Sequence, residues 1–564
     1  MMSDKNPKII LEEYENKFSY RKSKTNLNIQ FNRIAFIFFV FLAISIIFSI
    51  QLLHLGGLKE KVNSIKEPIN NKNYRADIID RNGNYLVKSV SSIDIGINPV
   101  EVIDKKRLLI NLRWIFPNKN YKEIEKKLNK NKFFKFEKQI SSMNYEKIMS
   151  LGDKAIKSEE KLTRLYPQEH LFSHIIGQID DDNNGISGLE KSFDYKLKKS
   201  RIPLQLTVDT NIQFLIRSEL IKFQEIFRAK GAAAILMDVN TGDIISMVSL
   251  PDFNLNERKT ITDVNYINRV TKGTYELGSV FKTFTIASGI NEALIEPDTE
   301  FLDSKKNIKC GKNYTIREYD DKMPSDLTVE QILIRSGNIG SVRIIKKIGI
   351  EKHKSFLKSI GILDKIDFDI EEVGKPQLID WYEGCKLETI SFGHGITTTI
   401  LQLAKGYAII SNGGYDIRPT LIKKDSDKNQ IREKILKNDV SKKINIILRK
   451  IISTEEGTAG QANVEGYQVG GKTGTAQQSI NKIYSKVKIN TLASIFPTKN
   501  PKYVLVVMLE GPKTASEYVY EYRNKPGKTQ TGSPYNTAGW TSAEVTGKII
   551  ENIGPILATK YIEN

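Results

Sequence analysis

Three short motifs carry residue types that together could perform acyl transfer through a serine. They are Ser279-Val280-Phe281-Lys282, Ser336-Gly337-Asn338 and Lys472-Thr473-Gly474-Thr475. A serine hydroxyl is a weak nucleophile and requires a base within hydrogen-bond reach. A lysine can act as that base only when its amine is neutral, and burial beside a second cation lowers a lysine pKa. The trio therefore predicts a mechanism that passes through a covalent acyl-enzyme.

The first two motifs supply the expected nucleophile and its proton-transfer partners. Ser279 is the predicted nucleophile and Lys282 its base. Ser336 is expected to relay a proton towards the leaving amine. Asn338 would hold both Lys282 and a substrate amide, because a side-chain amide can donate and accept hydrogen bonds at once.

The third motif is expected to bind the substrate. Lys472, with the hydroxyls of Thr473 and Thr475, would bind a terminal carboxylate on a strand whose small residues, Gly474 among them, let a substrate backbone approach closely. The peptide would lie along the edge of this strand as an added strand. The backbone N–H groups of Ser279 and Thr475 are the candidate donors to the developing oxyanion.

Chance matches to the first two motifs are frequent in this Lys- and Asn-rich chain. Lysine also follows three residues after Ser19, Ser158, Ser355 and Ser485, and Ser142-Met143-Asn144 imitates the second motif. Ser279 differs because it follows Gly278 and opens an apolar helix, whose positive end would lie at the hydroxyl. A glycine-rich bulge at Lys472 and a helix-connecting turn at Ser336 are the purely structural alternatives.

Strands and helices alternate in blocks around these motifs. Strands are expected over 232–238 and 244–249, joined by the turn Asn240-Thr241-Gly242, and again over 468–476, 489–496 and 503–509. Apolar spacing predicts helices over 281–291, 328–348, 400–410 and 543–560, the last kinked or interrupted by Pro555. This order describes an α+β domain in which the two ends of the domain complete one antiparallel sheet.

The N-terminal region reads as a membrane anchor followed by a separate module. Residues 34–53 contain no charge and are long enough to cross a bilayer as a helix. The residues after them offer no signal-peptidase site, so the anchor is expected to stay uncleaved. Basic residues precede the run, which places the short tail in the cytoplasm and the rest outside. Beyond the anchor, 75–97 reads as a hairpin around Asp80–Asn84 and 118–131 as a helix.

The bulk composition excludes several other classes of protein. The net charge of +19 would suit an anionic partner, but lysine is abundant throughout and no basic helix or aromatic–basic stripe indicates nucleic-acid binding. With two cysteines, Cys310 and Cys385, and five scattered histidines, neither a zinc site nor another metal site is expected. No P-loop is present and no cofactor is expected. Whether the two cysteines form a disulfide stays open.

The chain resembles the class B penicillin-binding proteins, and more closely their division-type (septal) transpeptidases, whose motif trio it carries. The stretches that carry the resemblance, beside the trio, are 75–83, 164–190, 391–396 with Gln402-Leu403-Ala404, and 466–477. The resemblance implies a β-rich, dimerisation-like pedestal and a penicillin-binding, serine β-lactamase-like transpeptidase domain. The expected boundaries are a tail over 1–33, an anchor over 34–55, the pedestal over 56–202 and the transpeptidase domain over 203–564.

The resemblance also implies a function and partners. It implies a D,D-transpeptidase of the bacterial inner membrane that cross-links stem peptides ending in D-Ala-D-Ala at the division site and is acylated by β-lactams. A membrane glycosyltransferase and other division proteins are the implied partners. Leu277 stands where many relatives carry Pro, and Gly337 where Ser is common; neither change removes a catalytic group.

Three other functions share parts of this pattern. A β-lactamase would use the same trio with an added base for deacylation, although the pedestal and uncleaved anchor argue against a secreted hydrolase. A non-catalytic penicillin-binding sensor or scaffold would need the trio to be vestigial, and all three motifs are intact. An elongation-type transpeptidase is the competitor within the family, and it differs in whether depletion gives round cells or filaments.

Overall fold

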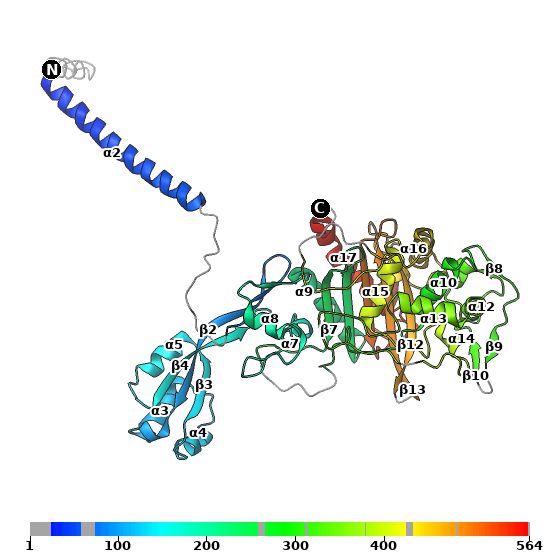
Figure 1. Ribbon diagram of the computed structural model, residues 1–564, viewed down its shortest axis with the longest axis horizontal. Coiled ribbons are helices and arrows are strands. Elements are labelled where there is room, and N and C mark those ends of the chain that lie inside the picture. The colour runs from blue at the N-terminus through cyan, green and yellow to red at the C-terminus, as the bar shows by residue number, and fades with distance from the viewer. Residues whose placement is uncertain are drawn as a thin grey trace, which may run out of the picture. The chain divides into compact units, whose positions relative to one another are not determined.

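The computed structural model describes residues 24–57, 74–257, 266–310, 314–377, 379–424, 432–480 and 483–561 (Figure 1). Its contacts divide the chain into two units, Met1–Lys72 and Asn73–Asn564. In the first unit, helix α2 runs over Lys24–Gly57. Its segment Ala35–Leu52 is, among the described residues, the one helix long and apolar enough to cross a membrane. This agrees with the single-pass anchor predicted from the sequence.

The second unit begins with the pedestal, which is built on one long strand. Strand β2, Tyr85–Ile97, pairs antiparallel with β1 (Ile78–Ile79), β3 (Phe134–Ile140) and β4 (Ile156–Leu165). The turn between β1 and β2 is the hairpin expected around Asp80, whose carboxylate accepts from the backbone N–H groups of Asn82 and Asn84. Helices α3 (Lys105–Ile115), α4 (Tyr121–Leu128) and α5 (Ser142–Met149) cover the far end with a separate apolar core.

A buried ion network holds the base of the pedestal together. The carboxylate of Glu190, in helix α7 (Gly188–Ser192), lies between two guanidinium groups. Its Oε2 is 2.5 Å from Arg75 Nε, and its Oε1 is 3.0 Å from Arg164 Nη2. Arg75 and Glu190 are fully buried, and Arg164 also donates to the carbonyls of Arg75 and Ala76. Removing one partner from such a network typically costs about 3–5 kcal/mol, because the remaining charge stays buried and unpaired. The network therefore joins two of the stretches that carry the family resemblance.

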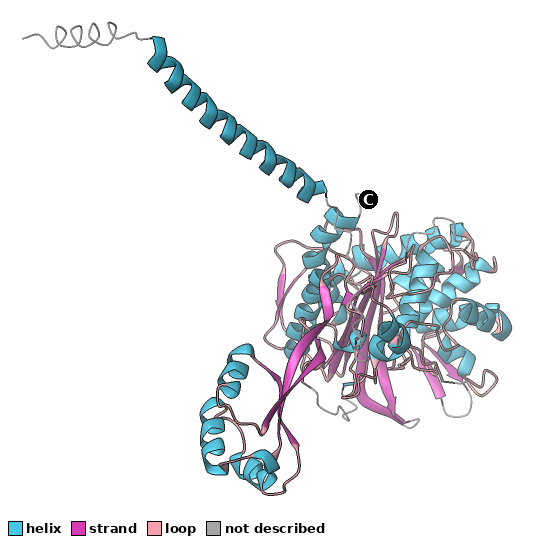
Figure 2. Ribbon diagram, turned by 60° about the vertical axis from the view of Figure 1, so that its left-hand side comes forward, coloured by secondary structure: helices cyan, strands magenta, loops and turns pink. Residues whose placement is uncertain are grey.

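The transpeptidase-like domain contains one antiparallel sheet made from its two ends. The strand order is β12-β13-β14-β6-β7. The strands are β6 (Gly231–Asp238), β7 (Ile244–Leu250), β12 (Gly470–Ile480), β13 (Ile483–Phe496) and β14 (Tyr503–Glu510). Figure 2 shows helices on both sides of this sheet. The prediction of an α+β domain whose two ends complete one antiparallel sheet is confirmed.

Helices pack on the sheet in two groups. Helices α9 (Thr210–Ile226) and α17 (Ser542–Tyr561) contact each other and strands of the sheet. Helices α10 (Phe281–Asn291), α15 (Ile400–Ser411) and α16 (Asn438–Ser453) belong to the helical block. Of these, α15 packs on β13 and β14, and α16 packs on β12. The expected helices 281–291 and 400–410 are therefore present, and α17 continues through Pro555 without interruption.

One expected helix, over 328–348, is wrong as a single element. The structure has two helices there, α11 (Val329–Ile334) and α12 (Asn338–Ile348). The chain breaks between them because Ser336 has a φ of 62° and Gly337 is extended. Neither conformation can continue a right-handed helix. The second motif therefore lies at the break, and Asn338 opens α12.

Candidate active site

Ser279 lies where a tight turn meets the edge strand of the sheet. The turn Gly278–Val280 directly precedes α10. Gly278 has a φ of +62°, and a Cβ on it would lie 2.9 Å from the carbonyl oxygen of Thr475. A Cβ on Gly474 would lie 2.1 Å from the carbonyl oxygen of Leu277. Both positions require glycine, and this close backbone approach places half-buried Ser279 beside β12.

The three motifs line one cavity of about 350 Å³. Ser279 comes from the turn, Ser336 and Asn338 from the α11–α12 break, and Thr473 and Thr475 from β12. Other lining residues are Tyr319, Arg335, His394, Glu456, Thr458 and Thr537. Residues that are far apart in the sequence thus meet around the predicted nucleophile.

The Lys282 amine is fully buried and is held by the second motif. Its Nζ donates to the Ser336 carbonyl at 2.5 Å, to the Ser336 hydroxyl at 3.1 Å and to Asn338 Oδ1 at 2.8 Å. Burial lowers the Lys282 pKa to about 7, against an opposing effect of the Glu318 charge. A large fraction of the amine is therefore neutral near pH 7, as a base requires.

Lys472 lies beneath the cavity surface. It is fully buried, and its Nζ donates to the carbonyl of Thr473 at 3.2 Å and to the Thr473 hydroxyl at 3.4 Å. Burial, and then the nearby charge of Lys282, lower the Lys472 pKa well below its usual value. From β12, Thr473 and Thr475 line the cavity. The hydroxyl of Thr473 is hydrogen-bonded to that of Thr458 at 2.7 Å, and the hydroxyl of Thr475 accepts from the Ala538 N–H at 3.0 Å.

Sequence reasoning missed a group of residues beside Asn338. The Glu318 carboxylate accepts from the backbone N–H groups of Asn338 and Ile339, and the Arg317 carbonyl accepts from the Asn338 side chain. His394 also lines the cavity; burial, and then the Lys282 charge, lower its pKa to about 4 and keep it neutral. Arg317 and Glu318 stand in no motif, so the sequence offers no local signal for them, whereas His394 lies in the stretch 391–396 that carries the family resemblance.

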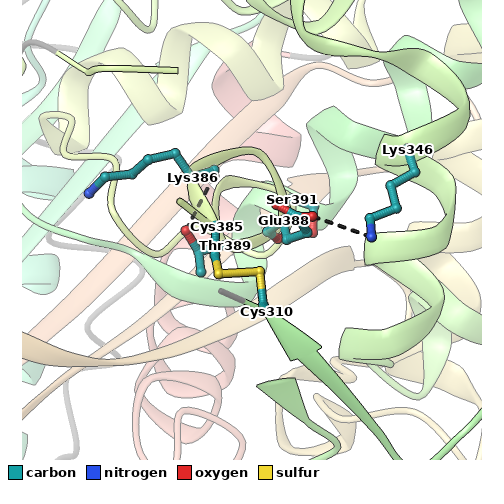
Figure 3. Close-up of a disulfide and its surroundings, with 7 residues drawn as sticks. All are labelled: Cys310, Lys346, Cys385, Lys386, Glu388, Thr389 and Ser391. Atoms are coloured by element: carbon teal, nitrogen blue, oxygen red, sulfur yellow. Dashed lines mark hydrogen bonds and ion pairs between the residues drawn. A yellow bond between two sulfur atoms is a disulfide. The ribbon is translucent and has the colours of Figure 1, made fainter. Parts of the chain in front are cut away.

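The question of the two cysteines, left open by the sequence, has a structural answer. Cys310, at the end of strand β9 (Asn307–Cys310), forms a disulfide with Cys385, which directly precedes helix α14 (Lys386–Ile390) (Figure 3). The bridge packs in a small apolar cluster with Ile316, Ile339 and Phe392. It therefore ties two segments that flank the cavity.

Comparison with known proteins identifies the family. Residues 232–528 match the model of the penicillin binding protein transpeptidase domain, and residues 70–217 match that of the penicillin-binding protein dimerisation domain. The chain belongs to the class B penicillin-binding proteins. The predicted family, fold and enzyme class, a penicillin-binding transpeptidase, are thereby confirmed.

Individual relatives match this chain in sequence over most of its length. It is 28% identical over 499 residues to the probable peptidoglycan D,D-transpeptidase FtsI of Caulobacter vibrioides, covering 86% of this chain and 82% of the relative. It is 26% identical to the stage V sporulation protein D of Bacillus subtilis, and the match covers 87% of this chain and 79% of that relative. The crystal structure of penicillin binding protein 3 from Mycobacterium tuberculosis with aztreonam superposes with a TM-score of 0.65 at 20% identity. The superposition covers 87% of this chain and 97% of that one, and it shows that the two share a fold.

Acylation of this penicillin-binding protein by a penicillin should become faster as pH rises through about 7. Lys282 accepts a proton only when neutral, so the rate should follow the neutral fraction of an amine whose pKa is about 7. The measurement is the second-order rate of labelling by a fluorescent penicillin across this range. Replacing Lys282 by Arg, which stays charged, should slow labelling by about 100-fold or more.

The matched control for this prediction is Lys358→Arg. Lys358 follows Ser355 in the same spacing but lies at the exposed surface of helix α13, Ile350–Ser359. The Lys358→Arg variant should be labelled by the fluorescent penicillin at the wild-type rate. A rate that is flat across neutral pH, or that rises only near pH 10, would contradict a neutral Lys282.

Proposed function

We propose that this chain is a peptidoglycan D,D-transpeptidase that cross-links stem peptides through an acyl-enzyme on Ser279 during septal wall synthesis. The observation that carries the proposal is the Lys282 amine, which is fully buried and donates to Ser336 and Asn338 in the cavity that Ser279 lines. A serine, a lysine of lowered pKa and a second hydroxyl are the groups that acyl transfer requires.

In the first half-reaction the hydroxyl of Ser279 attacks the carbonyl carbon of the penultimate D-Ala, and its proton passes to Lys282. The backbone N–H groups of Ser279 and Thr475 donate to the oxyanion that forms. Collapse of this intermediate breaks the terminal peptide bond. The proton returns through the hydroxyl of Ser336, which Lys282 contacts at 3.1 Å, to the amine of the departing D-Ala.

In the second half-reaction the amine of another stem peptide attacks the ester. It loses a proton to Lys282, the new amide forms and the hydroxyl of Ser279 is regenerated. No outside oxidant or energy source enters, since one peptide bond is exchanged for another.

The substrate would lie along β12, which pairs with β13 on one side only and forms the edge of the sheet. An extended peptide can add to such an edge through backbone hydrogen bonds. The hydroxyls of Thr473 and Thr475 would bind its terminal carboxylate, with Lys472 supplying positive charge from beneath Thr473. Binding of the anion favours the charged form of Lys472, although burial disfavours it in the empty site.

The anchor and the basic N-terminal tail support an orientation with the catalytic domain in the periplasm. Lys17, Arg21, Lys22, Lys24 and Arg33 precede the span. In that location the enzyme would act on stem peptides of the wall, would be acylated by β-lactams, and would work beside a membrane glycosyltransferase and other division proteins.

The likeness to a protein named FtsI, together with the stretches 391–396 and 466–477, supports a division role over an elongation role. Depletion of the protein in its own host should therefore produce filaments that grow without dividing. Light microscopy of depleted cells checks this. Rounded cells would assign the chain to elongation instead, while leaving the chemistry proposed above unchanged.

Replacing Ser279 by Ala should abolish covalent labelling of the full chain by a fluorescent penicillin, because the ester oxygen is lost. The matched control is Ser355→Ala, which alters the exposed serine of a chance motif on α13 and should leave labelling unchanged. Labelling should persist over a time course in the wild type.

The other outcomes separate the rival functions. Labelling that survives the Ser279 change would overturn the assignment of the nucleophile. Rapid loss of label from the wild type would indicate a β-lactamase. A wild type that takes no label would favour a scaffold.

A further inference from the structure

Glu318 caps the helix that carries the second motif. It directly follows strand β10 (Tyr314–Arg317), which pairs antiparallel with β9. Its two carboxylate oxygens accept separately from the backbone N–H of Asn338 at 2.7 Å and of Ile339 at 2.8 Å. These are the first two residues of α12, whose N–H groups have no acceptor within the helix. A carboxylate at this end is also favoured by the helix dipole.

The backbone of the neighbouring Arg317 also contacts Asn338. Its carbonyl accepts from Asn338 Nδ2 at 2.8 Å, while Asn338 Oδ1 accepts from Lys282 Nζ at 2.8 Å. The side-chain amide of Asn338 is thus fixed at both ends, and its backbone N–H is fixed by Glu318. Rotation of the Asn338 side chain would break both of its side-chain contacts at once.

We infer that Glu318 is a positioning residue of the acyl-transfer site: by holding Asn338 and the start of α12, it fixes the place of the Lys282 amine. This inference rests on the function proposed above. Glu318 acts through Asn338 and through its charge, and it lies outside the three motifs by which the site was found.

The β9–β10 hairpin that carries Glu318 is itself held at two places. The disulfide joins Cys310 of β9 to Cys385 before α14, and Glu388 of α14 pairs with Lys346 of α12 at 3.3 Å (Figure 3). Ile316 of β10 packs in one apolar cluster with Ile339 of α12. The hairpin, α14 and α12 therefore form a closed set of contacts, which keeps the Glu318 carboxylate in register with α12.

The charge of Glu318 gives this role a signature that a purely structural cap lacks. Three charged or titratable groups influence Lys282 or are influenced by it: Glu318 after β10, Lys472 on β12 and His394 after α14. Glu318 raises the Lys282 pKa, and His394 stays neutral in this range. Removing the negative charge must therefore lower the Lys282 pKa and extend the neutral, reactive form to lower pH.

The test is the pH profile of penicillin acylation by the full-length Glu318→Gln variant in detergent. Glutamine keeps the size of the side chain, retains one acceptor oxygen and loses the charge. The rate at its plateau should fall by roughly 10- to 100-fold, the effect of losing one charge-assisted hydrogen bond. The rising limb of the profile, where the acylation rate increases with pH, should lie at lower pH than in the wild type. Glu300→Gln, an exposed carboxylate on β8 (Glu300–Phe301), is the matched control and should change neither.

A second variant guards against a general loss of folding. Glu318→Asp keeps the charge but shortens the reach, so it should lower the plateau rate while leaving the limb near its wild-type position. An unchanged Glu318→Gln profile would overturn the inference, and so would a slower rate without any shift of the limb. Either result would leave the Ser279 assignment intact, since that depends on loss of the adduct in Ser279→Ala.

Discussion

The burial of the Lys282 amine is the interaction on which the rest of the site depends. A buried amine favours the neutral form, but its N–H groups still need acceptors. In the neutral amine the two N–H groups donate to the carbonyl of Ser336 and to the amide oxygen of Asn338, and the hydroxyl of Ser336 lies 3.1 Å from the nitrogen. These uncharged oxygens hold the amine in place without the strong rise in pKa that direct pairing with a carboxylate would cause. The more distant charge of Glu318 raises the Lys282 pKa, but by less than burial lowers it.

This requirement explains the break between α11 and α12. In a continuous helix the carbonyl of Ser336 would accept from the backbone four residues later and could not serve Lys282. The positive φ of Ser336 ends α11 and leaves its carbonyl and hydroxyl available on one side of the amine. On the other side of the cavity, Gly278 and Gly474 let the turn and β12 approach closely enough to share the cavity. The positive φ of Ser336, a backbone conformation that is costly for a residue with a side chain, thus lies where the chemistry is proposed to occur.

Much of this arrangement follows from the sequence, and the parts that do not have identifiable reasons. The apolar strands β6, β7 and β14 and the helix α10 were predictable, because short apolar runs bounded by turn residues indicate the strands and apolar spacing indicates the helix. The break at Ser336 was not, since apolar spacing continues across it and positive φ at a serine has no sequence signature. Glu318 and the Cys310–Cys385 bridge depend on contacts between distant segments. Lys472, expected to help bind a terminal carboxylate, is fully buried with its amine on the Thr473 carbonyl, a depth that the motif does not indicate.

The most direct test of the central claim is to locate the penicillin adduct within the chain. Trypsin cleavage after Lys272 and Lys282 releases the peptide 273–282, in which Thr274, Tyr275 and Ser279 carry hydroxyls. Tandem mass spectrometry of labelled protein should place the added mass on Ser279. An adduct on Thr274 or Tyr275, or on a peptide containing Ser336 or Ser355, would contradict the account in which the buried amine of Lys282 activates Ser279.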